Sequence, residues 1–329
     1  YYILSMHIDC SHTMIITLGD KLLKIIIIGQ SDFGASTVER LIKNRNNSVL
    51  AVFTPPPTKT GQEDPMVKVS KINNVKIFQF PKLNSKEATK TFQNLKADLC
   101  VMAYVTDIVP EEIIFFPKFG TIQYHPSLLP KHRGPSSINW AIINGESKTG
   151  LTIFWPDKGL DTGPILLQKE VQIGANDTVG TLYFNKLFPL GINAIEESVD
   201  LIRSGLYPMK NQDEHVATYE SWCKKEDVQI NWNKNVNDLH NLIRGSDPQP
   251  GAHTTLKSQS ISIFGSHKLI GTQNEIPGLV LSLDKTGIRI ACLGGSILFE
   301  KVRQKNDRKI SAFEWSKSVK LKINDVAGR

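Results

Sequence analysis

Two side chains in this sequence can form an acid–base pair. His125 ends the apolar stretch TIQYH and precedes a loop, PSLLPKHRG, which two prolines stiffen. Asp161 comes later, in the turn DKGLDTG, between Gly159 and Gly163. An aspartate that reaches an imidazole can orient a water molecule and stabilise the protonated ring near neutral pH. His125 and Asp161 are therefore candidates for general acid–base catalysis.

Both residues also have a plain structural interpretation. A single histidine is most often a satisfied residue of the core or the surface, and an aspartate next to glycine is common in turns. The position of His125, at the end of a predicted strand and before a stiff loop, favours the catalytic interpretation. Spacing alone identifies a candidate pair and no particular reaction.

Gly29 and Gly34 raise a different hypothesis, a dinucleotide site in the stretch GQSDFG. The fingerprint of such sites is G-x-G-x-x-G, in which the second glycine lets the backbone approach a pyrophosphate. Ser31 stands at that position here, and residues 54–57 (TPPP) stand where an acidic residue would close the next strand. We interpret these glycines as a tight turn between a strand and a helix.

The apolar segments that precede His125 in the sequence indicate a sheet that would position it. The continuous apolar runs KIIIIG, SVLAVF and ADLCVMAYV alternate with segments of helical spacing. This alternation predicts an α/β domain with a mostly parallel, Rossmann-like sheet covered on both faces. Ligands of such sheets bind beyond the carboxyl ends of the strands, and His125 lies at one of these ends.

The pattern changes near residue 222. One predicted helix, NVNDLHNLIRG, is followed by short strands separated by glycines, such as SISIFGSHKLI, GIRIACL and SILFEKVR. This pattern predicts a small, OB-like β-barrel domain. We expect a leader or an unassigned segment at 1–21, a catalytic domain at 22–222 and the β-barrel-like domain at 223–329.

Composition narrows the class of protein. The net charge of +7 is spread over the 329 residues without a dense basic block, which favours an ordinary solvated surface over a nucleic-acid interface. Four scattered cysteines without metal-ligand spacing indicate free thiols in a reducing compartment and argue against a metal site. No apolar run is long enough to span a membrane. We expect a cytoplasmic protein, with a mitochondrial location as the alternative because the amino terminus is undefined.

The blocks HPSLLPKHRG, INWAIINGE and GLDTG resemble the signature of the folate-dependent formyltransferase and hydrolase superfamily. Further blocks, from KIIIIGQSDFG to LHNLIRGSDPQPGAH, resemble the amino-terminal hydrolase region of 10-formyltetrahydrofolate dehydrogenases and occur in the same order. The resemblance covers about residues 23–320. It implies the formyltransferase fold and hydrolysis of 10-formyltetrahydrofolate to tetrahydrofolate and formate.

The resemblance also implies roles for individual residues. His125 would be the acid–base residue and Asp161 the carboxylate essential for turnover. The pterin would lie against the loop TDIVP, whose candidate contacts are Asp107, Ile108 and Val109. Tyr124, the aromatic residue before His125, is a further candidate contact. The basic triplet at 131–133 (Lys131, His132, Arg133) either lines the rim for the anionic folate tail or forms an ordinary solvated loop.

Gln123 departs from the pattern of the family. Transferring members carry asparagine two residues before the histidine, where it supports the oxyanion, and the dehydrogenases carry an apolar residue there. A glutamine amide can donate to an oxyanion, but its extra methylene displaces the donor. This departure leaves the choice between transfer and hydrolysis open. Tyr124, the stretch FWPDKG and the blocks that follow it resemble the dehydrogenases, so hydrolysis is the main hypothesis. Formyl transfer to methionyl-tRNA or another amine is the alternative, and a folate-binding or carrier-docking module with weak catalysis is the third hypothesis.

The expected partner is the folate substrate, with neither nucleic acid nor membrane on the main hypothesis. In a longer chain, a carrier domain and an NADP-dependent aldehyde dehydrogenase domain would follow, and a homo-oligomer would form through them. NADP is expected only with those domains.

Overall fold

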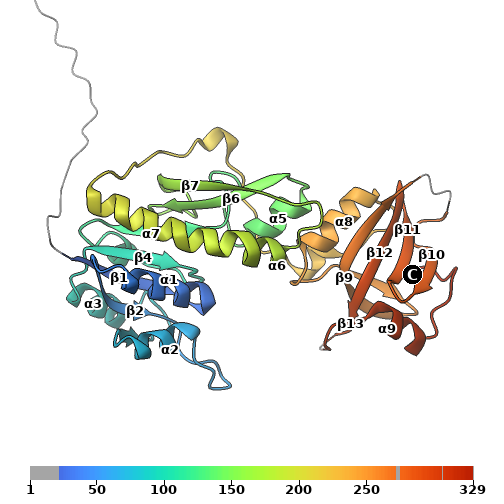
Figure 1. Ribbon diagram of the computed structural model, residues 1–329, viewed down its shortest axis with the longest axis horizontal. Helices are drawn as coiled ribbons and strands as arrows, with labels where there is room; N and C mark the ends of the chain where they lie inside the picture. Colours follow the sequence, from blue (N-terminus) through green and yellow to red (C-terminus); the bar gives the residue numbers. More distant parts are fainter. Residues whose placement is uncertain (1–21, 272–274, 306, 329) are drawn as a thin grey trace, which may run out of the picture.

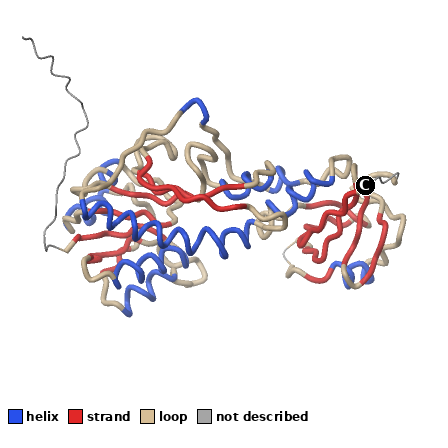
Figure 2. Tube along the Cα trace, turned by 45° about the horizontal axis from the view of Figure 1, so that its top comes forward, coloured by secondary structure: helices blue, strands red, loops and turns tan. Residues whose placement is uncertain are grey.

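The computed structural model describes residues 22–271, 275–305 and 307–328, so the predicted leader at 1–21 lies outside the described residues. Two sheets stand near the two ends of an elongated molecule (Figure 1). The tube view shows the same two groups of strands, with helices along the larger sheet and between the two (Figure 2).

The larger sheet has seven strands in the order β3-β2-β1-β4-β5-β6-β7. Strands β1 to β5 pair in parallel, whereas β6 and β7 are antiparallel. The prediction of a mostly parallel sheet is confirmed. The strands are β1 (Leu23–Gly29), β2 (Asn47–Phe53), β3 (Lys76–Phe78), β4 (Leu99–Ala103), β5 (Thr121–His125), β6 (Lys148–Phe154) and β7 (Ile165–Gln172).

Helices cover both faces of this sheet, which explains why β1 is apolar at successive positions. Ile25 and Ile27 pack into one core cluster with α1 and α7, while Ile26 and Ile28 pack into a second cluster with α3 and α4. The helices are α1 (Ser31–Lys43), α2 (Pro65–Ile72), α3 (Lys86–Asn94), α4 (Glu111–Ile114), α5 (Ser137–Ile143), α6 (Val179–Leu182) and α7 (Phe188–Ser204), with the π-helical segment η1 (Tyr183–Leu187) before α7.

The turn after β1 is tight, as expected from its glycines. A Cβ on Gly29 would lie 2.3 Å from the Ala103 carbonyl oxygen, so only glycine fits between β1 and β4. The Ser31 N–H, at the start of α1, donates to the Asp64 carboxylate at 2.8 Å. An acidic side chain therefore occupies the place where a dinucleotide site would bind a phosphate, in line with our interpretation of this stretch.

The second sheet is antiparallel, with the order β10-β11-β12-β9-β8 and β13 paired to β12. Its apolar side chains form one cluster with α8 and α9. The prediction of an α/β domain followed by a small β domain is confirmed. The elements are α8 (Val236–Gly245), β8 (His253–Leu256), β9 (Gln259–Ile270), β10 (Val280–Asp284), β11 (Gly287–Cys292), β12 (Gly295–Arg303), β13 (Ile310–Ser311) and α9 (Ala312–Ser318).

Helix α8 joins the two parts of the molecule (Figure 1). It approaches α5 so closely that a Cβ on Gly245 would lie 2.6 Å from an Ile143 side-chain carbon. His240 on α8 hydrogen-bonds Ala175, in the loop after β7, and Ser266 on β9. Between α7 and α8 runs a linker of residues 205–235, which contains two single 3-10 turns, η2 (Glu214–Val216) and η3 (Lys225–Val228), and the predicted boundary at 222/223.

Candidate active site

The structure brings His125 and Asp161 together. The Nδ1 atom of His125 lies 3.6 Å from Oδ2 of Asp161, and each side chain is only 7% exposed. This distance is longer than a hydrogen bond, as is common for catalytic pairs before substrate binds. The structure thus places the two side chains next to each other, while their catalytic role remains a prediction.

Asp161 reaches His125 from the loop between β6 and β7. Because β6 runs antiparallel to β5, it ends away from the carboxyl end of β5, where His125 lies. The loop after β6 must therefore turn back toward that end to bring Asp161 to His125. The return is tight: a Cβ on Gly163 would lie 1.7 Å from the Trp155 carbonyl oxygen. Asp161 itself adopts a left-handed φ of 57°, and its Oδ2 accepts the Gly134 N–H at 2.8 Å. The glycine-bounded turn thus holds the carboxylate in one place.

The tautomer of His125 follows from its hydrogen bonds. Its Nε2 lies 2.8 Å from the carbonyl oxygen of His132. A carbonyl only accepts, so Nε2 carries a hydrogen, and Nδ1 is the nitrogen that gains or loses a proton. This nitrogen faces Asp161. The pair therefore has the arrangement in which a carboxylate stabilises an imidazolium.

The loop behind His125 is fixed by hydrogen bonds as well as by its prolines. Ser127 donates its hydroxyl to the Lys131 carbonyl, and Thr152 on β6 donates its hydroxyl to the Ser127 carbonyl. The backbone N–H of Leu129 in turn donates to the Thr152 hydroxyl. These contacts restrict the conformations that the loop after His125 can adopt.

Two residues of the basic triplet are not on the rim, so both hypotheses about them were wrong. His132 and Arg133 are 4% and 0% exposed, and only Lys131 is exposed. The ring of His132 lies between Glu146 and Glu220, at 2.8 and 2.9 Å. A charged side chain is buried only when a partner compensates it, and the sequence did not show which partners these were.

Arg133 is paired with the linker that follows α7. Its guanidinium donates to Glu214 and Tyr219 and to the side-chain oxygen of Gln212. These hydrogen bonds, above all that with Glu214, raise the pKa of Arg133 and lower the pKa of the Glu214 carboxyl. The amide of Gln212 also donates to the carbonyls of Asp161 and Gly163, at 2.8 and 2.7 Å.

The linker thus holds both loops of the candidate site, and sequence reasoning missed this role. One signal was present: the basic triplet KHR has a complementary run of acidic residues in DEHVATYE, at 213–220. Complementary charge indicates an affinity between segments, but many exposed residues carry the same charges, so the partners could not be chosen.

Gln123 and Tyr124 point to opposite faces of β5, because side chains alternate along a strand. Gln123 shares the face of His125 and is partly buried. Tyr124 packs in the core, with its ring centroid 4.4 Å from that of Phe33, and burial raises its pKa well above the usual range. The structure therefore does not bring Tyr124 to the pair, and its predicted contact with substrate has no support in this placement.

The loop after β4 lies at the same edge of the sheet as His125, since β4 and β5 are parallel. The Asp107 carboxylate accepts the N–H groups of Leu83 and Ile108, both at 3.0 Å. Ile108 is 81% exposed, whereas Val109 is buried in the cluster on the His125 side of the sheet. The predicted contact residues thus form a fixed loop with one apolar side chain open to solvent.

Other chemistry finds less support in the described part of the chain. The free thiols Cys100, Cys223 and Cys292 are poor nucleophiles, because burial raises the pKa of Cys100 to about 12 and that of the other two to about 11. The residues described here contain no cluster of three metal-ligating side chains. Within the same ranges, no helix has the length and apolar character needed to cross a bilayer.

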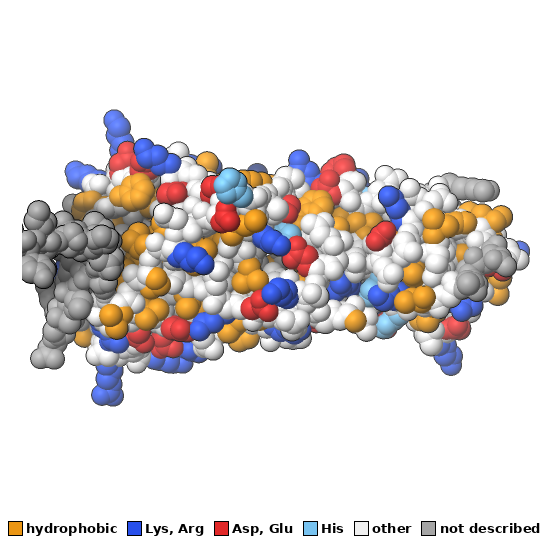
Figure 3. All heavy atoms as spheres, turned by 90° about the horizontal axis from the view of Figure 1, so that it is seen from above, with side chains coloured by type: hydrophobic (Ala, Val, Ile, Leu, Met, Phe, Trp, Pro, Cys, Tyr) orange, Lys and Arg blue, Asp and Glu red, His pale blue; other side chains and the backbone are white. Residues whose placement is uncertain are grey.

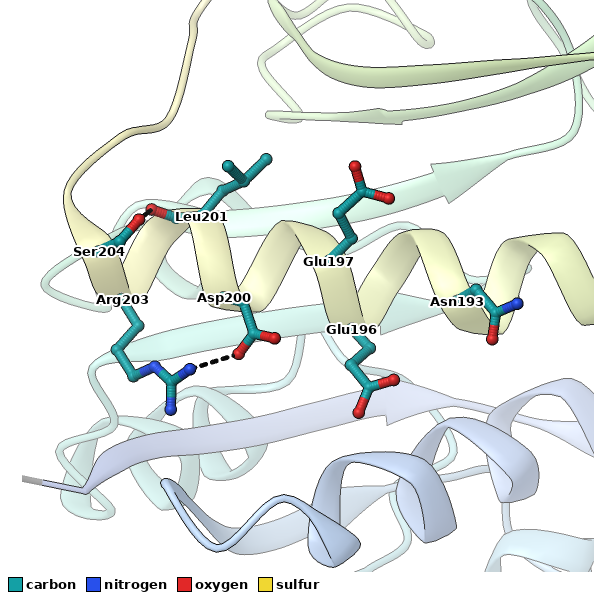
Figure 4. Close-up of a pocket in the computed structure, with 7 residues that line it drawn as sticks. All are labelled: Asn193, Glu196, Glu197, Asp200, Leu201, Arg203 and Ser204. Carbon is teal, nitrogen blue, oxygen red and sulfur yellow. Dashed lines mark hydrogen bonds and ion pairs between the residues drawn. The ribbon is translucent and has the colours of Figure 1, made fainter.

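A surface hollow on α7 contains none of the predicted residues (Figure 4). It lies on the sheet face opposite to His125, and its charges pair with neighbours: Arg203 with Asp200 at 2.7 Å, and Glu196 with Arg40 at 2.9 Å. These groups are already satisfied at the surface, so the hollow adds no chemistry.

Comparison with known proteins agrees with this geometry. The formyl transferase family matches residues 23–191, and the formyl transferase C-terminal domain matches residues 223–320. The mitochondrial 10-formyltetrahydrofolate dehydrogenase of Mus musculus is 43% identical over 75% of this chain. The cytosolic 10-formyltetrahydrofolate dehydrogenase of Xenopus tropicalis also matches, so the relatives include mitochondrial and cytosolic forms. The chain spans only 27% of the length of the mouse protein.

Two further matches cover most of the chain. A methionyl-tRNA formyltransferase from Acetivibrio thermocellus is 34% identical over 93% of this chain and 100% of its own length. The structure of HypX from Aquifex aeolicus in complex with tetrahydrofolic acid covers 92% of this chain and 48% of its own, with a TM-score of 0.67 and 17% identity. At this identity the structural match shows a shared fold alone. From the two domain matches and the fold, this chain belongs to the formyl transferase family.

Proposed function

We propose that this chain hydrolyses 10-formyltetrahydrofolate to tetrahydrofolate and formate. The observation that carries the proposal is the buried His125–Asp161 pair at the ligand-binding edge of the sheet, with Nδ1 free to exchange a proton. The identity with 10-formyltetrahydrofolate dehydrogenases supports the choice of substrate.

In the proposed reaction, water adds to the formyl carbon and the bond from this carbon to N10 breaks. His125 takes a proton from the attacking water at Nδ1 and delivers it to N10 as the bond breaks. Asp161 stabilises the imidazolium between these two steps. General acid–base groups of this kind each contribute about 10²–10⁴-fold in rate.

Gln123 is the proposed donor to the oxyanion that forms on the formyl carbon. It shares a face of β5 with His125, and its side-chain amide can donate a hydrogen bond. Loss of one oxyanion donor typically costs about 10²–10³-fold in turnover.

The loop after β4 is the proposed site for the pterin. Backbone groups of Asp107, Ile108 and Val109 would bind the ring, and the ties from Asp107 to the backbone keep this loop in shape. The exposed Ile108 side chain would cover the apolar part of the ligand. No metal and no second cofactor enter this proposal.

Incubation of the protein with 10-formyltetrahydrofolate alone tests the proposal. We expect stoichiometric release of formate and tetrahydrofolate, and we expect the His125→Asn variant to bind folate while releasing formate at least about 100-fold more slowly. Substrate that binds and stays intact would favour the folate-binding module. Formate release that His125→Asn leaves unchanged would remove the assigned mechanism.

The second candidate function is transfer of the formyl group to an amine such as methionyl-tRNA. The match to the full length of a methionyl-tRNA formyltransferase favours it. On the face drawn in Figure 3, however, basic and acidic side chains are interspersed, whereas a nucleic-acid interface concentrates basic ones. Formylation of methionyl-tRNA at a rate above that of formate release, with binding that weakens in salt, would decide for transfer.

The proposal for this chain ends at formate and tetrahydrofolate. The dehydrogenases that it matches are longer, and we propose that a carrier domain and an NADP-dependent domain accompany the hydrolase in such a protein. Homo-oligomerisation and a cytosolic rather than mitochondrial location are likewise proposals.

A further inference from the structure

We propose that His132 is a positioning residue for His125. Its imidazole bridges the Glu146 and Glu220 carboxylates, and this bridge holds the His132 carbonyl against Nε2 of His125. The bridge thereby leaves Nδ1 as the nitrogen that faces Asp161. The inference rests on the proposed function, because the role of His132 is defined through His125.

The backbone of His132 is held in a strained shape by its neighbours. Its φ is 56°, in the left-handed region that costs a residue with a side chain about 1–2 kcal/mol. Its N–H donates to the Thr218 hydroxyl at 2.8 Å, and its ring is fixed by two carboxylates. Such strain persists only where surrounding contacts over-determine the conformation, and it clusters at functional sites.

The bridge joins three parts of the molecule. His132 belongs to the loop after β5, Glu146 to the turn between α5 and β6, and Glu220 to the linker after α7. Each ring nitrogen lies within hydrogen-bonding distance of one carboxylate oxygen, so the side chain ties the loop after β5 to both of the other segments. The Thr218 hydroxyl also donates to the Glu220 carboxylate, at 3.3 Å.

Backbone contacts between the loop after β5 and Glu220 of the linker add a second constraint. The Arg133 carbonyl accepts the Glu220 N–H at 3.0 Å, and a Cβ on Gly134 would lie 2.1 Å from the Glu220 carbonyl oxygen. Gly134 donates to Asp161, so the segment that carries the bridge also positions the second member of the pair. Movement of the His132 carbonyl would therefore alter the orientation of His125 relative to Asp161.

The variant His132→Asn tests the proposal. Asparagine tolerates a left-handed φ, so the backbone shape is retained, but its side chain is too short to reach both carboxylates. We expect kcat to fall by about 10- to 100-fold, as for a small misplacement of a catalytic group, while KM for 10-formyltetrahydrofolate changes less than about threefold. The conservative variant Glu220→Gln keeps a side-chain oxygen near the ring, so its kcat should fall less than that of His132→Asn.

The nitrogen NMR signals of the His125 ring give a readout that does not depend on turnover. In the wild-type protein we expect the form with hydrogen on Nε2, and in His132→Asn a mixture of the two neutral forms. His267→Asn is the matched control, because His267 makes a similar 2.8 Å contact with Glu300 on the exposed surface of the β domain. This control should change neither the His125 signals nor kcat.

Unchanged His125 signals in both His132→Asn and Glu220→Gln would overturn the proposal, as would a rise in KM without a fall in kcat. If the wild-type protein released no formate, the proposed function would fail. The NMR comparison would still test the positioning of His125 in that case.

Discussion

Neutral His240 should make the stability of the protein depend on pH. Burial lowers the pKa of His240 to about 4, from an ordinary value near 6.5, in spite of the hydrogen bond to the Ala175 carbonyl. Its other nitrogen accepts from Ser266, so the neutral ring is satisfied on both sides. The ring connects helix α8, the β domain and the loop after β7.

The sign of the effect follows from the direction of this shift. Above pH 6.5 the ring is neutral in the folded and the unfolded chain, so its contribution to stability is complete. As the pH falls from 6.5 to 4, His240 binds a proton in the unfolded chain but stays neutral in the folded chain, so the free energy of unfolding decreases. At 1.36 kcal/mol per pH unit, the decrease between pH 7.5 and 4.5 is about 2–3 kcal/mol for His240.

Urea unfolding at pH 7.5 and pH 4.5 measures this difference, with tryptophan fluorescence as the signal. The variant His240→Gln should be less stable than the wild type at pH 7.5 but should lose about 2–3 kcal/mol less on acidification. The variant His267→Gln is the control and should keep the wild-type dependence, because His267 is exposed. An equal loss in the wild type and in His240→Gln would refute the reasoning.

Substitutions at three further positions test the site and its supports. Replacement of Gln123 by Asn should increase formyl transfer to an added amine relative to formate release, and Gln123→Leu should lower turnover by about 10²-fold in an initial-rate assay. Gly134→Ala should lower the Tm, because φ is 104° and the new Cβ would meet the Glu220 carbonyl. Arg133→Met should lower the free energy of unfolding, measured with urea, by about 2 kcal/mol, because the Gln212 side-chain oxygen loses its donor. Unchanged stability would contradict the role of Arg133 in holding the linker.

The large sheet could be predicted from the sequence because its strands are unusually apolar. In runs such as residues 25–28, successive side chains point to opposite faces, so burial of all of them requires a sheet that is covered on both faces. The antiparallel pair β6 and β7 was not predicted. Exposure alternates along part of β7, at the edge of the sheet, so its sequence lacks the continuous apolar run that marks the parallel strands.

The site could be predicted only in part. His125 and Asp161 stand next to a proline-stiffened loop and between glycines, which are local signals of fixed geometry. His132 has one nearby partner, Glu146, but its second partner and that of Arg133 lie in a linker 88 and 81 residues away, and such distant pairs leave no local pattern. Tyr124 adjoins His125 in sequence, but strand alternation sends it to the opposite face.

The most direct test of the central claim is a double-mutant cycle on kcat/KM for formate release, with His125→Asn, Asp161→Asn and the double variant. Each single change should lower kcat/KM by about 10²–10⁴-fold. Because the two side chains act as a unit, the double variant should be little worse than the poorer single variant. Losses that multiply in the double variant would mean that the two residues act independently, and would contradict the account.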